Sequence, residues 1–65
     1  MKTKLFSTKD GVVLYEDENG KLVSSNMKAV KAAIMEDIKS NDIPFDYKMG
    51  AILVMNRIKV QEEAN

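Results

Sequence analysis

A chain of 65 residues, 45% of them hydrophobic, is long enough for one folded domain and too apolar to remain disordered. It contains no Cys and no His, which excludes disulfides, thiolate metal sites and the commonest general base of enzymes. Its 10 basic and 10 acidic residues balance, whereas a dedicated duplex DNA binder usually carries a basic surplus. The composition therefore predicts a single domain over residues 1–65.

The first 25 residues have the pattern of a small antiparallel β-meander of two or three strands. Val, Leu and Tyr side chains suited to strands gather in residues 12–15 and 21–24, with residues 3–6 as a weaker third run. Asp17 and Gly20 bound a turn in which the carboxylate accepts backbone hydrogen bonds and the glycine takes a positive φ. A type I turn closed by a glycine bulge fits best, and a two-residue Asn-Gly turn is the alternative.

Residues 26–40 are predicted to form the first helix. Ser24, Ser25 and Asn26 are all good N-cap residues, and an apolar stripe begins directly after them. Four residues of this stripe recur at helical spacing: Met27, Val30, Ile34 and Ile38. The helix should end near Ser40, because the residues leading to Pro44 favour turn and extended conformations.

Residues 46–62 are predicted to form the second helix, with Asp46 as its N-cap. At 100° per residue, one face carries side chains suited to the core: Tyr47, Ala51, Val54, Met55 and Ile58. A strand from 51 to 61 is the alternative, because apolar residues in this segment also alternate with polar ones. We favour the helix, since a strand of that length is long for so small a domain.

The opposite face of this predicted helix carries a second apolar stripe. Met49, Leu53, Asn56 and Val60 have the spacing of a short heptad seam, and Ile52 lies nearby. One thin core cannot cover both stripes, so the second is predicted to contact another chain. Met35, beside the core stripe of the first helix, is a further candidate, because flexible thioethers suit adaptable binding surfaces.

No motif for catalysis, metal or cofactor binding is found. With Gly20 in the sixth position of a calcium loop, Tyr15 and Asn26 take the two anchor positions, and neither is the required carboxylate. Glu36 and Asp37 point about 100° apart on a helix and do not converge for acid–base chemistry. We therefore expect no cofactor and no enzymatic activity.

Nucleic-acid or nucleotide binding is the alternative function, with Lys2, Lys4, Lys9 and Arg57 as contacts. The order strand, helix, loop, helix resembles that of ribbon-helix-helix repressors, which are obligate dimers that read the major groove with a paired strand. Only the order of elements carries this resemblance, and the acidic hairpin and the neutral charge argue against it. A sheet-face binder of single strands would use Phe6 and Tyr15 beside the lysines.

The favoured prediction is a non-catalytic protein-binding module: a small inhibitor or adaptor that covers another protein's surface and assembles into a homodimer or a higher oligomer. Small accessory proteins of phages offer an analogy of size. The longest apolar run, residues 49–55, falls far short of the ~20 residues that a membrane span needs. Ser7 interrupts the apolar stretch that a signal peptide would need. We therefore expect no membrane segment and a soluble, cytoplasmic protein.

Overall fold

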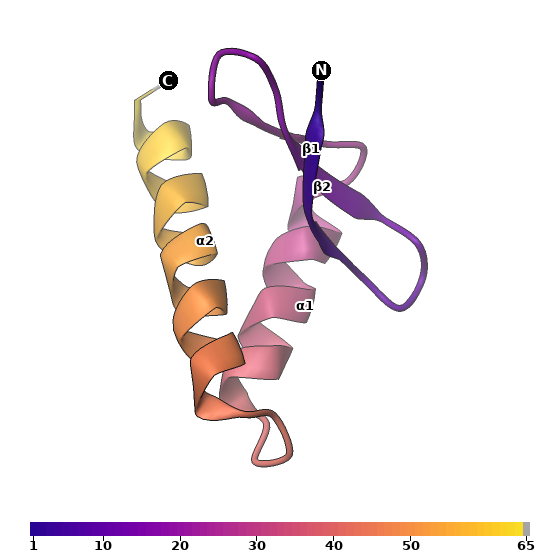
Figure 1. Ribbon diagram of the computed structural model, residues 1–65, viewed down its shortest axis with the longest axis vertical. Coiled ribbons are helices and arrows are strands. Elements are labelled where there is room, and N and C mark those ends of the chain that lie inside the picture. The colour runs from indigo at the N-terminus through magenta and orange to yellow at the C-terminus, as the bar shows by residue number, and fades with distance from the viewer. Residues whose placement is uncertain (65) are drawn as a thin grey trace.

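The computed structural model, which describes residues 1–64, has a three-stranded antiparallel sheet followed by two helices (Figure 1). The elements are β1 (Thr3–Ser7), β2 (Val13–Glu16), β3 (Leu22–Ser24), α1 (Met27–Lys39) and α2 (Phe45–Glu63). The strands lie in the order β1-β2-β3, with β2 in the centre. This arrangement confirms the expected α+β class and the order of its elements.

Two turns of the same form connect the strands. Gly11 and Gly20 have φ of 88° and 79°, and their N–H groups donate to the carbonyls of Thr8 and Asp17 at 3.1 Å. Asp17 Oδ1 also accepts the backbone N–H groups of Asn19 and Lys21, both at 2.9 Å. These are type I turns closed by a glycine bulge, so the two-residue alternative is wrong. The Asp17 carboxylate organises its own turn.

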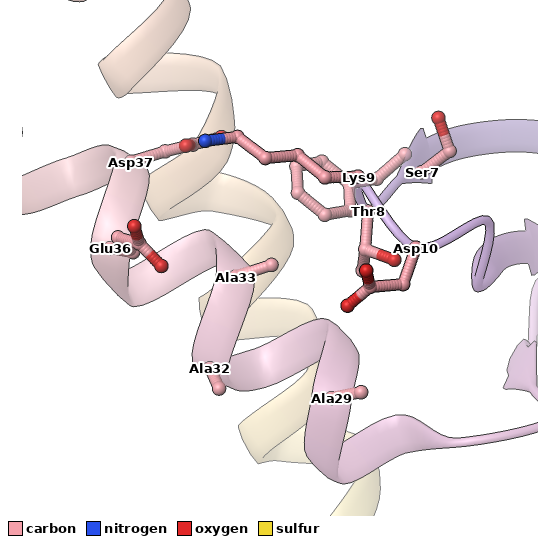
Figure 2. Close-up of a pocket in the computed structure, with 10 residues that line it drawn as sticks. Ser7, Thr8, Lys9, Asp10, Ala29, Ala32, Ala33, Glu36 and Asp37 are labelled. Atoms are coloured by element: carbon pink, nitrogen blue, oxygen red, sulfur yellow. The ribbon is translucent and has the colours of Figure 1, made fainter.

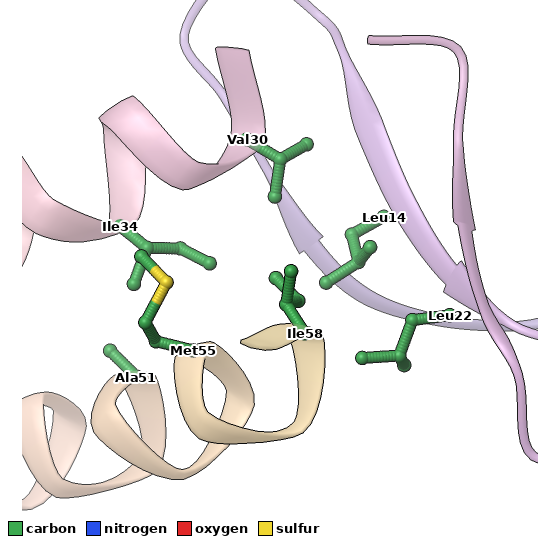
Figure 3. Packing of buried hydrophobic residues seen from close by; sticks show 7 residues of the cluster. All are labelled: Leu14, Leu22, Val30, Ile34, Ala51, Met55 and Ile58. Atoms are coloured by element: carbon green, nitrogen blue, oxygen red, sulfur yellow. The ribbon is translucent and has the colours of Figure 1, made fainter. Parts of the chain in front are cut away.

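One face of the sheet packs against both helices, and the core lies between these two layers (Figure 3). Seven buried side chains form it: Leu14, Leu22, Val30, Ile34, Ala51, Met55 and Ile58. Figure 3 shows Ile58 of α2 directed toward the strand residues and Met55 lying against Ile34 of α1. Because all three packed elements contribute to one cluster, the two helices and the meander depend on each other for burial.

Local chemistry defines the ends of α1. Asn26 is its N-cap, and the Asn26 side chain accepts the Ala29 N–H at 3.0 Å. At the other end, the Ser40 N–H donates to the Asp37 carbonyl at 3.2 Å, and the chain then turns toward Pro44. The predicted bounds of this helix are thus confirmed to within one residue.

The segment after Pro44 is helical throughout, so the strand alternative is wrong. The helix begins at Phe45, one residue before the predicted start, and Pro44 rather than Asp46 occupies the N-cap position. Pro44 has φ of −58°, which suits the entry to a helix, and its carbonyl accepts the Lys48 N–H at 3.2 Å. Asp46 lies in the first turn, where its negative charge interacts favourably with the helix dipole.

The side chain of Gln61 joins α2 to the edge strand β3. Its Oε1 accepts the Leu22 N–H at 2.7 Å, and its Nε2 donates to the Leu22 carbonyl at 2.8 Å. The amide thereby occupies the backbone groups of Leu22 that an added strand would otherwise pair with. One turn earlier, Arg57 Nη2 donates to the Gly20 carbonyl at 3.3 Å. Polar side chains of α2 therefore cover this edge of the sheet.

Replacing Gln61 by Leu should lower the free energy of unfolding by about 1–3 kcal/mol, because the part-buried N–H and C=O of Leu22 lose both partners. Urea denaturation followed by circular dichroism measures the loss, and faster hydrogen exchange of the Leu22 amide should accompany it. Glu63→Gln, on the exposed end of the same helix, is the control and should change little. Equal stability of Gln61→Leu and the native chain would contradict this role.

Candidate functional site

Helix α2 has apolar side chains on two opposite faces, and the chain buries only one of them. Ala51, Met55 and Ile58 lie in the core. The other face carries exposed residues, which we call the outer face of α2: Phe45, Met49, Ile52, Leu53, Asn56 and Val60. Leu53 is 61% exposed and Val60 67%. The five predicted contact residues of this helix therefore share one accessible surface.

The outer face of α2 is a narrow and continuous stripe. At 100° per residue its six side chains fall within an arc of about 100°, centred opposite the core-facing stripe. Figure 1 shows α1 and the sheet lying on one side of α2, which leaves the opposite flank uncovered by other elements. Among residues 1–64, α2 holds six of the eight large hydrophobic residues that are exposed. Exposed apolar area is thus concentrated on this one helix.

Two residues of α2 differ from the sequence-based prediction. Tyr47, predicted for the core, is 47% exposed, because it lies in the first turn, before the stripe that meets the sheet. Partial burial, then the hydrogen bond from its hydroxyl to Asp37 Oδ2 (3.2 Å) and the Asp37 charge, raise the pKa of Tyr47 above its usual value. Phe45, 73% exposed, was missed because the predicted helix began too late to include it. Its spacing of four residues from Met49 was the available signal.

Met35, the remaining predicted contact residue, is 37% exposed but belongs to α1. It follows Lys31 by one turn, and Lys31 Nζ contacts both carboxylate oxygens of Glu62 in α2 at 3.0 Å. Met35 is therefore on a flank of α1 that borders α2. A partner would have to span both helices to contact it together with the outer face.

A groove of about 570 Å³ runs between the outer face of α2 and the β2–β3 turn. Its lining is mainly apolar: Gly20, Leu22, Leu53, Asn56, Arg57, Val60 and Gln61. Leu53, Asn56 and Val60 belong to both the groove and the outer face, so the two form one continuous surface. The ion pair of Arg57 Nη2 with Glu16 Oε2 (2.5 Å) holds the guanidinium of this lining residue against the meander. An apolar ridge beside an apolar groove, with charged groups at the margin, is typical of protein interfaces.

The open face of the sheet carries two of the four predicted cationic contacts. Lys2 Nζ lies 5.8 Å from the centroid of the Tyr15 ring, and Lys4 is the register partner of Tyr15 in β1. Phe6 does not join them, because it packs against the core cluster. The aromatic platform predicted for a sheet-face binder is thereby reduced to one ring.

The other two cations lie elsewhere. Lys9 is in the β1–β2 turn and lines a separate groove, and Arg57 is ion-paired with Glu16 beside α2. The four predicted cationic contacts therefore occupy three separate places. This spacing provides no common track for a nucleic-acid backbone.

The groove that Lys9 lines has a volume of about 410 Å³ and lies between the β1–β2 turn and α1 (Figure 2). Its lining on the helix side includes three alanines and two carboxylates: Ala29, Ala32, Ala33, Glu36 and Asp37. Asp37 is engaged by the Tyr47 hydroxyl. In the described part of the chain, residues 1–64, no group of three acidic residues is placed to hold a metal ion. The groove thus presents ordinary surface charges above small side chains.

Within residues 1–64, neither helix is both long enough and apolar enough to cross a membrane. Comparison with models of protein families, with curated proteins and with solved structures finds no match to this chain. The outer face of α2 holds most of the large hydrophobic residues that are exposed among residues 1–64, and it adjoins the groove.

Proposed function

We propose that this chain is a non-catalytic protein-binding module, an inhibitor or adaptor that covers part of another protein's surface with the outer face of α2. The observation that carries this proposal is the row of exposed large apolar side chains on one face of a 19-residue helix. Exposure of so large an apolar stripe to water is unfavourable in free energy unless a partner covers it. Amphipathic helices commonly bind proteins by laying such a face into a groove.

Apolar burial at the outer face would contribute favourably to such a contact. Full burial of one large aliphatic side chain stabilises a complex by roughly 1.5–3 kcal/mol. Leu53 and Val60 both retain more than half of their exposure in the single chain. They also border the groove, so a partner's side chains can enter it while the partner's main surface covers the stripe.

The surroundings of the polar groups favour binding over catalysis. Catalytic acids and bases depend on burial or on close charges to adjust their pKa values. Among residues 1–64, no polar or charged residue is buried. Nucleic-acid or nucleotide binding, the alternative, has the support of Tyr15 beside Lys2 and Lys4, but the dispersed cations weaken it.

Affinity capture with a matched pair of variants tests the proposal. The native chain and Lys59→Asp should both retain a partner from a lysate of the organism that encodes the chain, while Leu53→Asp should lose it. Lys59 is exposed and lies on the flank of α2, so this control also introduces a carboxylate into the same helix. Mass spectrometry identifies the retained protein. Retention that is indifferent to Leu53→Asp would assign binding to another surface.

A further inference from the structure

We infer that the partner covering the outer face of α2 is a second copy of this chain, with the two α2 helices antiparallel about a twofold axis between Ile52 and Leu53. The inference rests on the proposed function, because it takes the same binding surface and identifies the protein that it covers as a second copy of this chain rather than a different protein. It is carried by the total exposed area, and the spacing and the flank charges of the stripe are compatible with it.

The residues of the outer face have a spacing that reads the same in both directions. The successive intervals from Phe45 to Val60 are 4, 3, 1, 3 and 4 residues. A twofold interface requires one patch to be complementary to its own reversed copy. Positions within one arc of a regular helix generally show this reversal, so the spacing permits antiparallel pairing of two copies without requiring it. The choice of a second copy therefore rests on the exposed area.

Antiparallel pairing about this centre also matches side chains by size. Phe45 would lie level with the partner's Val60, which sets a large ring against a small side chain. Ile52 and Leu53 of both copies would form the central layer. Met49 would lie level with the partner's Asn56, whose position at the groove leaves its amide within reach of water. Alternation of large and small residues is how helix faces interdigitate.

Antiparallel pairing would bring opposite charges together on one flank of the stripe and like charges together on the other. On the flank nearer the sheet, Asp46 would come within one helical turn of the partner's Arg57, whose guanidinium already pairs with Glu16 of its own chain, so the added attraction is small. On the other flank Lys48 would lie near the partner's Lys59, and Lys59 is exposed. Repulsion between solvated charges is weak. Because Lys59→Asp removes it, this variant should associate at least as well as the native chain.

The exposed area of the chain agrees with a missing partner. The chain exposes 4787 Å², whereas a compact monomer of its 7.3 kDa exposes about 4,200 Å². The excess of roughly 600 Å² approaches the ≈800 Å² that each partner contributes to a stable interface of standard size. Five of the eight large hydrophobic residues that are exposed among residues 1–64 lie on the outer face of α2, so this face is the candidate for the missing contact.

Light scattering on the purified chain tests the association itself. The native chain and Lys59→Asp should have the mass of two chains, and Leu53→Asp that of one, with a dissociation constant raised at least ~30-fold, as expected for a central contact residue. Circular dichroism should show the same helix content in all three. Because residue 53 meets its own copy near the axis, mixing Leu53→Asp with Leu53→Lys should restore a dimer that neither variant forms by itself.

Cross-linking tests the direction of pairing. The chain has no Cys, so Phe45→Cys and Val60→Cys each introduce a single thiol. A short bismaleimide should join the two variants when they are mixed. It should not join Val60→Cys to itself, because antiparallel pairing separates the two copies of residue 60 by ~22 Å along the helix axis.

Two results would overturn the inference. Efficient self-linking of Val60→Cys would exclude the antiparallel arrangement. A native chain that stays monomeric at millimolar concentration would exclude the second copy, and the capture experiment then separates the two proposals. If that monomer still retains another protein through Leu53, the inference fails and the proposed function stands. If it retains none, both fail.

Discussion

Replacing Ile58 by Ala should leave a substantial fraction of the chain unfolded at room temperature. Ile58 is fully buried and joins α2 to both α1 and the sheet (Figure 3). Truncation of a buried Ile to Ala typically costs 2–5 kcal/mol, through lost burial and the cavity left behind. At roughly 0.05–0.15 kcal/mol per residue, a chain of this length has only about 3–10 kcal/mol in total. Urea denaturation followed by circular dichroism measures the loss.

Val60→Ala is the matched control for Ile58→Ala. It truncates a β-branched side chain two residues away on the same helix, but on the outer face, where Val60 is 67% exposed. At concentrations below the dissociation constant of the proposed dimer, we expect a loss within about 0.5 kcal/mol, as for most surface substitutions. Equal losses for the two variants would mean that the folded chain buries both faces of α2.

The features of the fold that depend on neighbouring residues were predictable from sequence. The turns at Gly11 and Gly20 and the cap at Asn26 each depend on bonds that span at most four residues. The type of the last element was ambiguous, because its apolar residues fit both a helical and an alternating period. Packing of Ala51, Met55 and Ile58 against α1 and the sheet favours the helix. That packing joins residues far apart in the sequence, so no local sequence pattern predicts it.

Of the candidate surface, the outer face of α2 was predictable from local sequence spacing and the groove beside it was not. Helical spacing by itself separates Leu53 and Val60 from the core stripe, and both are exposed. The adjoining groove was not predictable, since it depends on contacts such as that of Gln61 with Leu22, 39 residues away. Arg57, predicted as an anion contact, is instead paired with Glu16 across 41 residues. Long-range polar contacts of this kind produce no periodic pattern in the sequence from which they could be predicted.

The thermal midpoint of the native chain should rise with protein concentration if the outer faces of two copies pair. A partner that binds only the folded state stabilises it by about 2.7 kcal/mol at 100 times its dissociation constant. A domain of 60–100 residues gains roughly 4–8 °C per kcal/mol. Raising the concentration from well below to well above the dissociation constant should therefore raise the midpoint by ten degrees or more.

Leu53→Asp provides the control for this concentration dependence. Leu53 is 61% exposed in the single chain, so the substitution should change the intrinsic stability little while it removes association. Its midpoint should stay constant across the series and match that of the native chain at the lowest concentration. Scanning calorimetry of both chains over a thousandfold range measures the two slopes. A flat native series would show that folding of α2 is complete without a second copy, whereas a rising Leu53→Asp series would place the association on a different surface.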